Sequence, residues 1–302
     1  MGTGNEYQQN NKKMMNQKYK GIIFIVLSAF FFALTNTFVR LSGDLPSVQK
    51  SFFRNFVAAL IAITILLKDK DDISIKKEHL KYFLLRAILG TIGVLCNFYA
   101  IDHLVMADAT MLNKMSPFFA IIFSWILLKE KLKPLQTIAI IGAFIGSLFI
   151  IKPTFQNAEI IPSLIGFMGG LTSGAGFCFI RILGNRGVKG VLIVFFFSSF
   201  SCITTLPYIV THYAPMTLKQ IFILMMAGTA AAGGQFSMTK AYFYAPAKEI
   251  SVYDYSQIIF AAIIGFVIFN QIPDKYSWLG YAIILSMAIM MFIYTDKDTS
   301  QQ

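Results

Sequence analysis

Ten mostly apolar blocks, each about 20 residues long, follow one another along this 302-residue chain. A helix of about 20 apolar residues crosses a hydrocarbon core roughly 30 Å thick. Because no water reaches the backbone there, each block must satisfy its own amide groups, as an α-helix does. The alternation over about ten residues that marks a membrane β-barrel strand is absent. We therefore predict an all-α integral membrane protein with ten transmembrane helices.

Short connections separate the predicted spans, and no soluble domain is inserted between them. A polar, basic tail at 1–20 precedes the first span without a signal-peptide cleavage pattern, so we expect that span to be retained. Residues 295–302 form a second polar tail. The spans are predicted at residues 21–39, 48–68, 82–102, 108–128, 134–152, 160–182, 189–211, 218–240, 248–270 and 276–294.

The distribution of positive charge predicts the orientation in the cell membrane. Only 14% of the residues are charged, yet the formal net charge is +11. Most Lys and Arg residues lie in connections on the same side as the N-terminal tail, for example in 68–81, as is typical of cytoplasmic segments. We therefore predict a multi-pass protein of the cell membrane with its N- and C-termini in the cytoplasm. Because the basic residues are spread over many connections, we expect no nucleic-acid partner.

The chain also resembles itself. When the first half is shifted by about 141 residues, "FVRLSG" (38–43) falls on "FIRILG" (179–184), and Ala139 falls on Gly280. The third span of each half needs a further adjustment of three residues. Each half holds five predicted spans, an odd number, so the second half must be upside down relative to the first. The pattern predicts two inverted five-helix repeats, 21–152 and 160–294, an arrangement that secondary transporters use for alternating access.

Several segments resemble EamA-type members of the drug/metabolite transporter superfamily. They are "SAFFFALTNTFVRL" in the first span, "FFRNFVAALI" in the second, "ADATMLNKMSPFFAIIFSWILLKEKL" in the fourth and "IIGAFIGSLFI" in the fifth. The resemblance covers nearly all of 20–294, and its most specific part runs from Pro117 to Glu130. It implies an inverted-repeat carrier for small polar metabolites, often amino acids or related amines. The second half departs from the pattern, since Gln271 stands where a Glu is expected and position 258 is not a Pro.

Lys114 and Asp254 are ionisable residues deep within predicted spans. A charge near the bilayer centre normally faces the protein interior or a water-filled cavity. From the rise of a helix we expect Lys114 at about 5 Å and Asp254 at about 8 Å from the midplane, on opposite sides. Our hypothesis is that Lys114 binds an anionic group, while Asp254 binds an amine or takes a proton. A plain ion pair that holds the bundle together is the alternative.

Polar and aromatic residues at similar depths complete the predicted substrate-binding site. Amides and aromatic rings suit a polar organic ligand with a flat or cationic part. Each of them alone is better explained by packing or by hydrogen bonding between helices, and the group as a whole supports the prediction. The set consists of Asn36, Asn97, Tyr99, Asn113, Ser116, Gln235, Tyr253, Tyr255 and Gln257.

Two further patterns predict structure more than chemistry. Gly166, Gly170 and Gly174 recur every four residues, which lines one helix face with small residues and predicts close packing of spans. A surface that slides during a conformational change is the alternative. Arg54 and Arg86 lie only a few residues inside their predicted spans, and we expect both side chains to reach the headgroup surface.

The function that fits best is a secondary-active or exchange transporter for a small polar metabolite, an amino acid or related amine. A channel or a structural membrane protein is the first alternative, but isolated deep charges of opposite sign fit an occluded site better than a wide pore. An integral membrane enzyme is the second alternative. The sequence holds no nucleophile motif, metal-ligand cluster or phosphate-binding loop, so no cofactor or metal is predicted. Proton coupling, uniport and a homodimer stay open.

Overall fold

The computed structural model describes the backbone of residues 3–68, 75–128, 134–151, 159–244 and 251–300. Within these residues every regular element is a helix. The elements are α1 (Thr3–Leu41), α2 (Ser47–Lys68), α3 (Lys77–His103), α4 (Met106–Asn113), α5 (Ser116–Leu128), α6 (Pro134–Ile151), α7 (Ile160–Asn185), α8 (Gly190–Thr211), α9 (Leu218–Tyr244), the short 3₁₀ helix η1 (Ser251–Tyr255), α11 (Ser256–Phe269) and α12 (Lys275–Ser300).

The helices follow the predicted apolar blocks. Among the described residues, eight segments are long and apolar enough to cross a membrane, and two shorter apolar helices cover Tyr253–Phe269 and Lys275–Met291. The prediction of an all-α membrane protein is therefore confirmed for the described residues. Helix α1 begins at Thr3 and α12 continues to Ser300, so both helices extend beyond the predicted spans into the polar tails. Glu130 lies outside the described residues.

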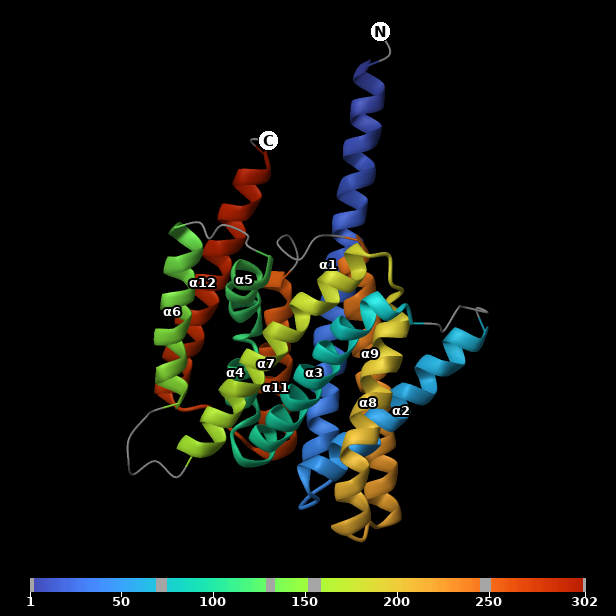
Figure 1. Ribbon diagram of the computed structural model, residues 1–302. Helices are drawn as coiled ribbons and strands as arrows, with labels where there is room; N and C mark the ends of the chain where they lie inside the picture. The colour runs from blue at the N-terminus through green and yellow to red at the C-terminus, as the bar shows by residue number, and fades with distance from the viewer. Residues whose placement is uncertain (1–2, 69–74, 129–133, 152–158, 245–250, 301–302) are drawn as a thin grey trace.

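The helices pack in pairs that join the two halves of the chain. The most extensive contacts are those of α1 with α9 and of α3 with α7, followed by α2 with α8 and α6 with α12. Figure 1 shows α6 and α12 side by side at one edge of the bundle, with α2, α8 and α9 at the other. Both chain ends lie at the same end of the bundle, as an even number of spans requires.

Glycines on α7 bring this helix close to α4 and α5. A Cβ atom at Gly170 would lie 2.6 Å from the carbonyl oxygen of Leu112, and one at Gly174 would lie 2.5 Å from that of Ser116. Neither distance leaves room for a methyl group, and a backbone oxygen has little freedom to move aside. The predicted close packing through the Gly166–Gly170–Gly174 series is therefore confirmed.

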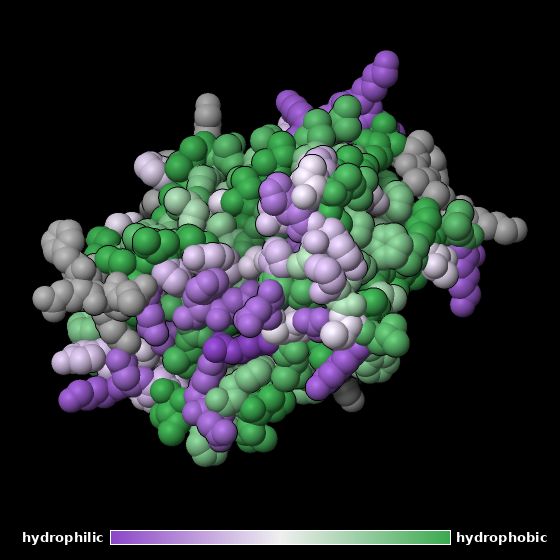
Figure 2. All heavy atoms as spheres, turned by 90° about the horizontal axis from the view of Figure 1, so that it is seen from below, coloured by the Kyte–Doolittle hydropathy of each residue, from purple (hydrophilic) through white to green (hydrophobic). Residues whose placement is uncertain are grey.

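The surface of the bundle agrees with a lipid environment. Large apolar side chains are exposed along the helices, among them Leu60, Ile141, Phe222, Ile259 and Ile289. Figure 2 views the end opposite the chain termini, where hydrophilic residues run across the face and apolar residues surround them. The polar surface is thus concentrated at the ends of the helices, where water meets the bilayer.

Candidate functional site

The predicted fourth span is interrupted by a turn, and among the described residues the ninth starts with a 3₁₀ helix, so both depart from a regular α-helix. The fourth consists of α4, a turn at Lys114 and Met115, and α5. Pro117 lies in the first turn of α5, where its missing N–H and fixed φ are tolerated, and it cannot continue a hydrogen-bonded helix from α4. In the ninth, η1 ends at Tyr255 and α11 begins at Ser256.

Lys114 and Asp254 meet at these two irregular segments. The ammonium group of Lys114 donates a hydrogen bond to Oδ2 of Asp254, and both residues are only 5% exposed. The other carboxylate oxygen of Asp254, Oδ1, has no hydrogen-bond partner among the described residues. The contact between the two side chains is the ion pair that the sequence analysis gave as the alternative to a substrate site.

The neighbouring residue Tyr255 joins the two irregular segments a second time. Its hydroxyl group donates a hydrogen bond of 3.1 Å to the backbone carbonyl oxygen of Lys114. This carbonyl lies at the turn after α4, where helical N–H partners are missing, so the phenol provides one. Lys114 and Tyr255 occupy equivalent positions when the halves are compared with the shift of about 141 residues.

A polar network on α1, α3 and α4 lies one helical turn from Lys114. The amide nitrogen of Asn97 donates to Oδ1 of Asn36 at 3.2 Å, and the amide nitrogen of Asn36 lies 3.5 Å from Oγ1 of Thr110. The backbone carbonyl of Thr110 accepts the N–H of Lys114. Oδ1 of Asn97 is buried without a partner among the described residues. Thr110 was missed in the sequence, where a lone threonine in an apolar block gives no signal.

The other predicted site residues fall into two groups. Ser116, Tyr255 and Gln257 are buried near the irregular segments, and the side chain of Asn113 is half-buried there. Tyr99 instead stacks on His103 at the end of α3, with ring centroids 4.1 Å apart. The remaining two, Gln235 on α9 and Tyr253 on η1, are half-buried, and Tyr253 packs against the cluster of Ile25, Met238 and Ala241.

Arg54 and Arg86 do not reach the headgroup surface, so that prediction was wrong. Their exposed fractions are 3% and 6%. The guanidinium carbons lie 5.9 Å and 4.5 Å from the centre of the Phe197 ring on α8. Because α3 begins at Lys77 and not at residue 82, Arg86 lies deeper in its helix than the predicted span implied. The predicted start of α2 differs by only one residue, and Arg54 is buried by its packing against α8.

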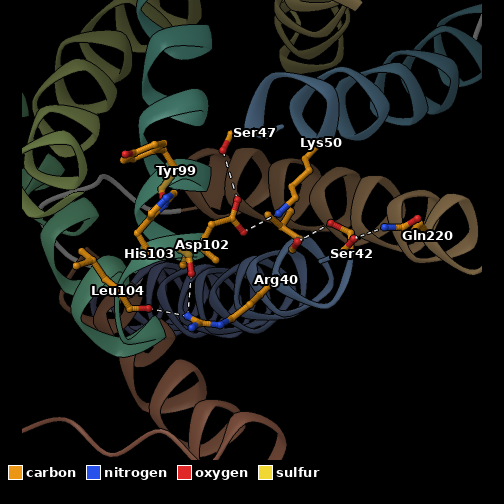
Figure 3. Close-up of polar contacts among 11 residues, drawn as sticks. Arg40, Ser42, Ser47, Lys50, Tyr99, Asp102, His103, Leu104 and Gln220 are labelled. Carbon is orange, nitrogen blue, oxygen red and sulfur yellow. Dashed lines mark hydrogen bonds and ion pairs between the residues drawn. The ribbon is translucent and has the colours of Figure 1, made fainter. Parts of the chain in front are cut away.

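A second ion pair joins the buried Lys50 to the partly buried Asp102 near the ends of α1 and α3 (Figure 3). Nζ of Lys50 donates to Oδ1 of Asp102 at 2.7 Å, and the hydroxyl group of Ser47 lies 3.3 Å from the other carboxylate oxygen. Nearby, Arg40 donates to the carbonyl oxygens of Ile101 and Leu104. These bonds tie the ends of α1, α2 and α3 together. Lys50 itself is 1% exposed.

Part of the chain is similar to a known protein family. Residues 19–152 match the model of the EamA-like transporter family, and this range is nearly that of the first predicted repeat. The first half of the chain is therefore similar to the EamA-like transporter family. The resemblance that the sequence motifs predicted is confirmed, and the relatives extend it beyond the first half of the chain.

Three relatives that are named as transporters or solute carriers align with most of the chain. The chain is 28% identical over 273 residues to the pseudopaline exporter CntI of Pseudomonas aeruginosa, which spans 90% of this chain and 95% of the exporter. It is 24% identical over 294 residues to the riboflavin transporter of Vibrio cholerae, covering 94% and 96% of the two chains. Human solute carrier family 35 member G1 is 26% identical over 276 residues, covering 84% and 73%.

A solved structure supports the same architecture. It superposes with a TM-score of 0.64 over 92% of this chain and 98% of its own, at 14% sequence identity. At this identity the match shows the fold alone. The two bacterial transporters above are named for different cargoes. The cargo of this chain must therefore be argued from its own residues.

Proposed function

We propose that this protein is a secondary-active or exchange transporter. It moves a small polar metabolite that carries both an amine and a carboxylate across the cytoplasmic membrane by alternating access. The observation that carries the proposal is the buried Lys114–Asp254 pair at the two irregular segments. Interrupted helices near the middle of the membrane are where secondary transporters bind their substrates.

The pair has the chemistry that a zwitterion requires. Without substrate, Lys114 and Asp254 neutralise each other, so neither is left as an isolated buried charge. A zwitterion that enters between them offers its carboxylate to Lys114 and its amine to Asp254. The single ion pair between the two side chains is then replaced by two ion pairs, one from each side chain to the substrate. Oδ1 of Asp254 also gains a hydrogen-bond donor, which it lacks among the described residues. Asn36, Asn97 and Tyr255 supply further polar groups nearby.

The arrangement of the helices supports an inverted repeat and hence alternating access. Under the proposed repeat, α1 corresponds to α7 and α9 to α3, so the contact of α1 with α9 and that of α7 with α3 are equivalent. These two contacts are the most extensive in the bundle. The contacts of α2 with α8 and of α6 with α12 each join a helix to its own equivalent. A pseudo-two-fold axis requires such reciprocal pairs.

The orientation follows from the same architecture. Both termini lie at one end of the bundle, and most Lys and Arg residues of the connections belong to that side. We propose that this end faces the cytoplasm, according to the positive-inside rule. Cysteine labelling of intact cells tests it: Thr217→Cys, at the opposite end, should react with an impermeant maleimide, and Lys189→Cys should not.

Counterflow in proteoliposomes tests the transport proposal. Vesicles with the purified protein are loaded with unlabelled L-amino acids, and uptake of each labelled amino acid is followed. A carrier accumulates label transiently, whereas a channel does not. Lys114→Met and Asp254→Asn should each reduce counterflow at least about tenfold, because each removes a charged hydrogen-bond partner. Lys219→Met, at an exposed position, is the control.

Three results would contradict this proposal. Variants of Lys114 and Asp254 that retain full counterflow would show that the pair does not bind substrate. Loss of membrane abundance without loss of specific activity would assign the pair to stability alone. Turnover of a compound without movement across the membrane would indicate an enzyme. Proton coupling is measured in the same vesicles from the effect of a pH gradient on uptake.

A further inference from the structure

Arg54 and Arg86 form a second buried cationic centre, separate from the neutral Lys114–Asp254 pair. Both guanidinium groups face the ring of Phe197, so their central carbons lie within about 10.4 Å of each other. Arg54 comes from α2 and Arg86 from α3, helices whose first residues, Ser47 and Lys77, lie at opposite ends of the bundle. At 1.5 Å per residue, the arginines lie about 10 Å and about 13 Å along their helices. Both are therefore far from either membrane surface.

Neither charge is compensated in the part of the chain that the structure describes. Nη1 of Arg54 donates to the neutral amide oxygen of Asn55 at 2.5 Å, and no carboxylate contacts either guanidinium there. Nε of Arg54 and Nε of Arg86 are buried without a hydrogen-bond partner, and so is the hydroxyl group of Ser198, which follows Phe197. Unused donors thus accompany both buried positive charges.

Two glycines, Gly90 and Gly176, lie beside the Arg86 side chain. A Cβ atom at Gly90 would lie 1.9 Å from Nη1 of Arg86, and one at Gly176 of α7 would lie 3.6 Å from the same nitrogen. The guanidinium group therefore occupies space that any other residue at position 90 would fill.

The energetics point to a missing anion. Removing a charge from water is costly, and removing two like charges in one region adds their repulsion. The face of one aromatic ring attracts a cation, but far less than an oxyanion would. An arrangement that keeps two buried guanidinium groups and leaves their donors unused is stabilised most by a bound group with negative charge and several acceptor atoms.

We propose that Arg54 and Arg86 bind a carboxylate of the transported molecule. This site rests on the proposed transport function and assigns the cargo a second acidic group. The helix α7 passes both centres: Gly170 approaches the backbone of Asn113, next to Lys114, and Gly176 approaches Arg86. Six residues of helix separate these glycines, which corresponds to about 9 Å. A cargo with a zwitterionic end and a carboxylate about that far away would contact both centres.

The first test compares acetate with acetamide, which have the same shape but differ in charge. The melting temperature of the purified protein in detergent is measured against each probe, with ionic strength held equal by sodium chloride. Acetate should stabilise the parent protein and acetamide should not. Arg54→Met and Arg86→Met should each weaken the apparent affinity for acetate at least about tenfold, because each removes charge-assisted hydrogen bonds. Arg186→Gln, an exposed arginine stacked on Tyr82, is the control.

The stability of the variants without probe gives a second, independent readout. An apolar residue of similar volume removes an uncompensated buried charge, so Arg86→Met should melt at a higher temperature than the parent. A structural arginine would give the opposite result. The proposal is overturned if Arg86→Met lowers the melting temperature, or if acetate and acetamide act alike on the parent.

The counterflow experiment separates this proposal from that of the transport function. If the parent protein shows counterflow and the arginine variants keep it for every anionic cargo, the second site is wrong and transport stands. If the parent shows no counterflow but acetate stabilises it through the arginines, transport is wrong and the anion site stands.

Discussion

Replacing Lys114 and Asp254 singly and together separates an ion pair from two independent side chains. The variants are Lys114→Met, Asp254→Leu and the double variant, all of similar volume to the parent residues. Removal of one partner leaves the other as a buried charge without compensation. Removal of both leaves neither charge. The single variants should therefore be much less stable than the double variant.

The magnitude follows from the burial of the pair. Both residues are 5% exposed, and breaking such a pair costs about 3–5 kcal/mol for either partner. The double variant should lie within about 1 kcal/mol of the parent or be more stable. In the parent, Oδ1 of Asp254 is buried without a hydrogen-bond partner among the described residues, so part of its desolvation cost is not recovered. We therefore expect the double variant to be more stable than the parent. The coupling energy is then at least about 6 kcal/mol, well above the average of about 0.6 kcal/mol for interhelical hydrogen bonds.

Unfolding in mixed dodecyl sulfate and maltoside micelles, followed by far-UV circular dichroism, measures these free energies. Lys219→Met at an exposed position should change stability by less than about 0.5 kcal/mol and serves as control. If the effects of the two single replacements add to within about 0.5 kcal/mol in the double variant, the side chains do not interact. That result would refute both the ion pair and the exchange mechanism built on it.

Three further predictions concern packing and backbone geometry and use the same unfolding assay. Gly170→Ala should cost about 1–3 kcal/mol because its Cβ would meet a backbone oxygen at 2.6 Å. Gly184→Ala on the same helix, with nothing within 4 Å, should be neutral or stabilising; equal costs would contradict the packing argument. Asn270, with a φ of 52°, ends α11 in the left-handed region, so Asn270→Ala should cost about 1 kcal/mol and Asn270→Gly less; the reverse order would contradict it. Tyr281→Phe removes a 2.6 Å hydrogen bond to the carboxylate of Asp108 and should cost about 1.5–3 kcal/mol; an unchanged stability would show that this bond contributes nothing.

The sequence predicts the membrane helices well because their signal is local. An apolar block of about 20 residues has few alternatives to a helix in lipid. The interruption at Lys114 has a local cause in Pro117, which we used only as part of a family motif. The equivalent irregular segment at Tyr255 has no proline, since position 258 is Ile. There the 3₁₀ helix η1 leads directly into α11, and Tyr255 donates a hydrogen bond to the carbonyl of Lys114, a contact between residues far apart in the sequence.

The charged residues show where sequence reasoning about depth fails. The sequence singles out Lys114 and Asp254, but their predicted depths assume that both spans are regular helices. Arg86 was placed near a surface because the predicted third span began at residue 82, whereas α3 begins at Lys77. The helix therefore starts more than one turn earlier than predicted, and the Arg86 side chain is too deep to reach the headgroup surface. Lys50 on α2 forms an ion pair with Asp102 on α3. The two residues are far apart in the sequence, so no local pattern predicts this contact.

The pairing of Lys114 with Asp254 has a consequence for the response to membrane potential. The pair carries no net charge whether the shared proton lies on nitrogen or on oxygen. When the empty protein changes conformation, the electric field therefore does no net work on this pair, whereas each uncompensated elementary charge would contribute about 2.3 kcal/mol per 100 mV. Voltage dependence of the transport cycle would then report the charge of the cargo, together with any displacement of Arg54 and Arg86.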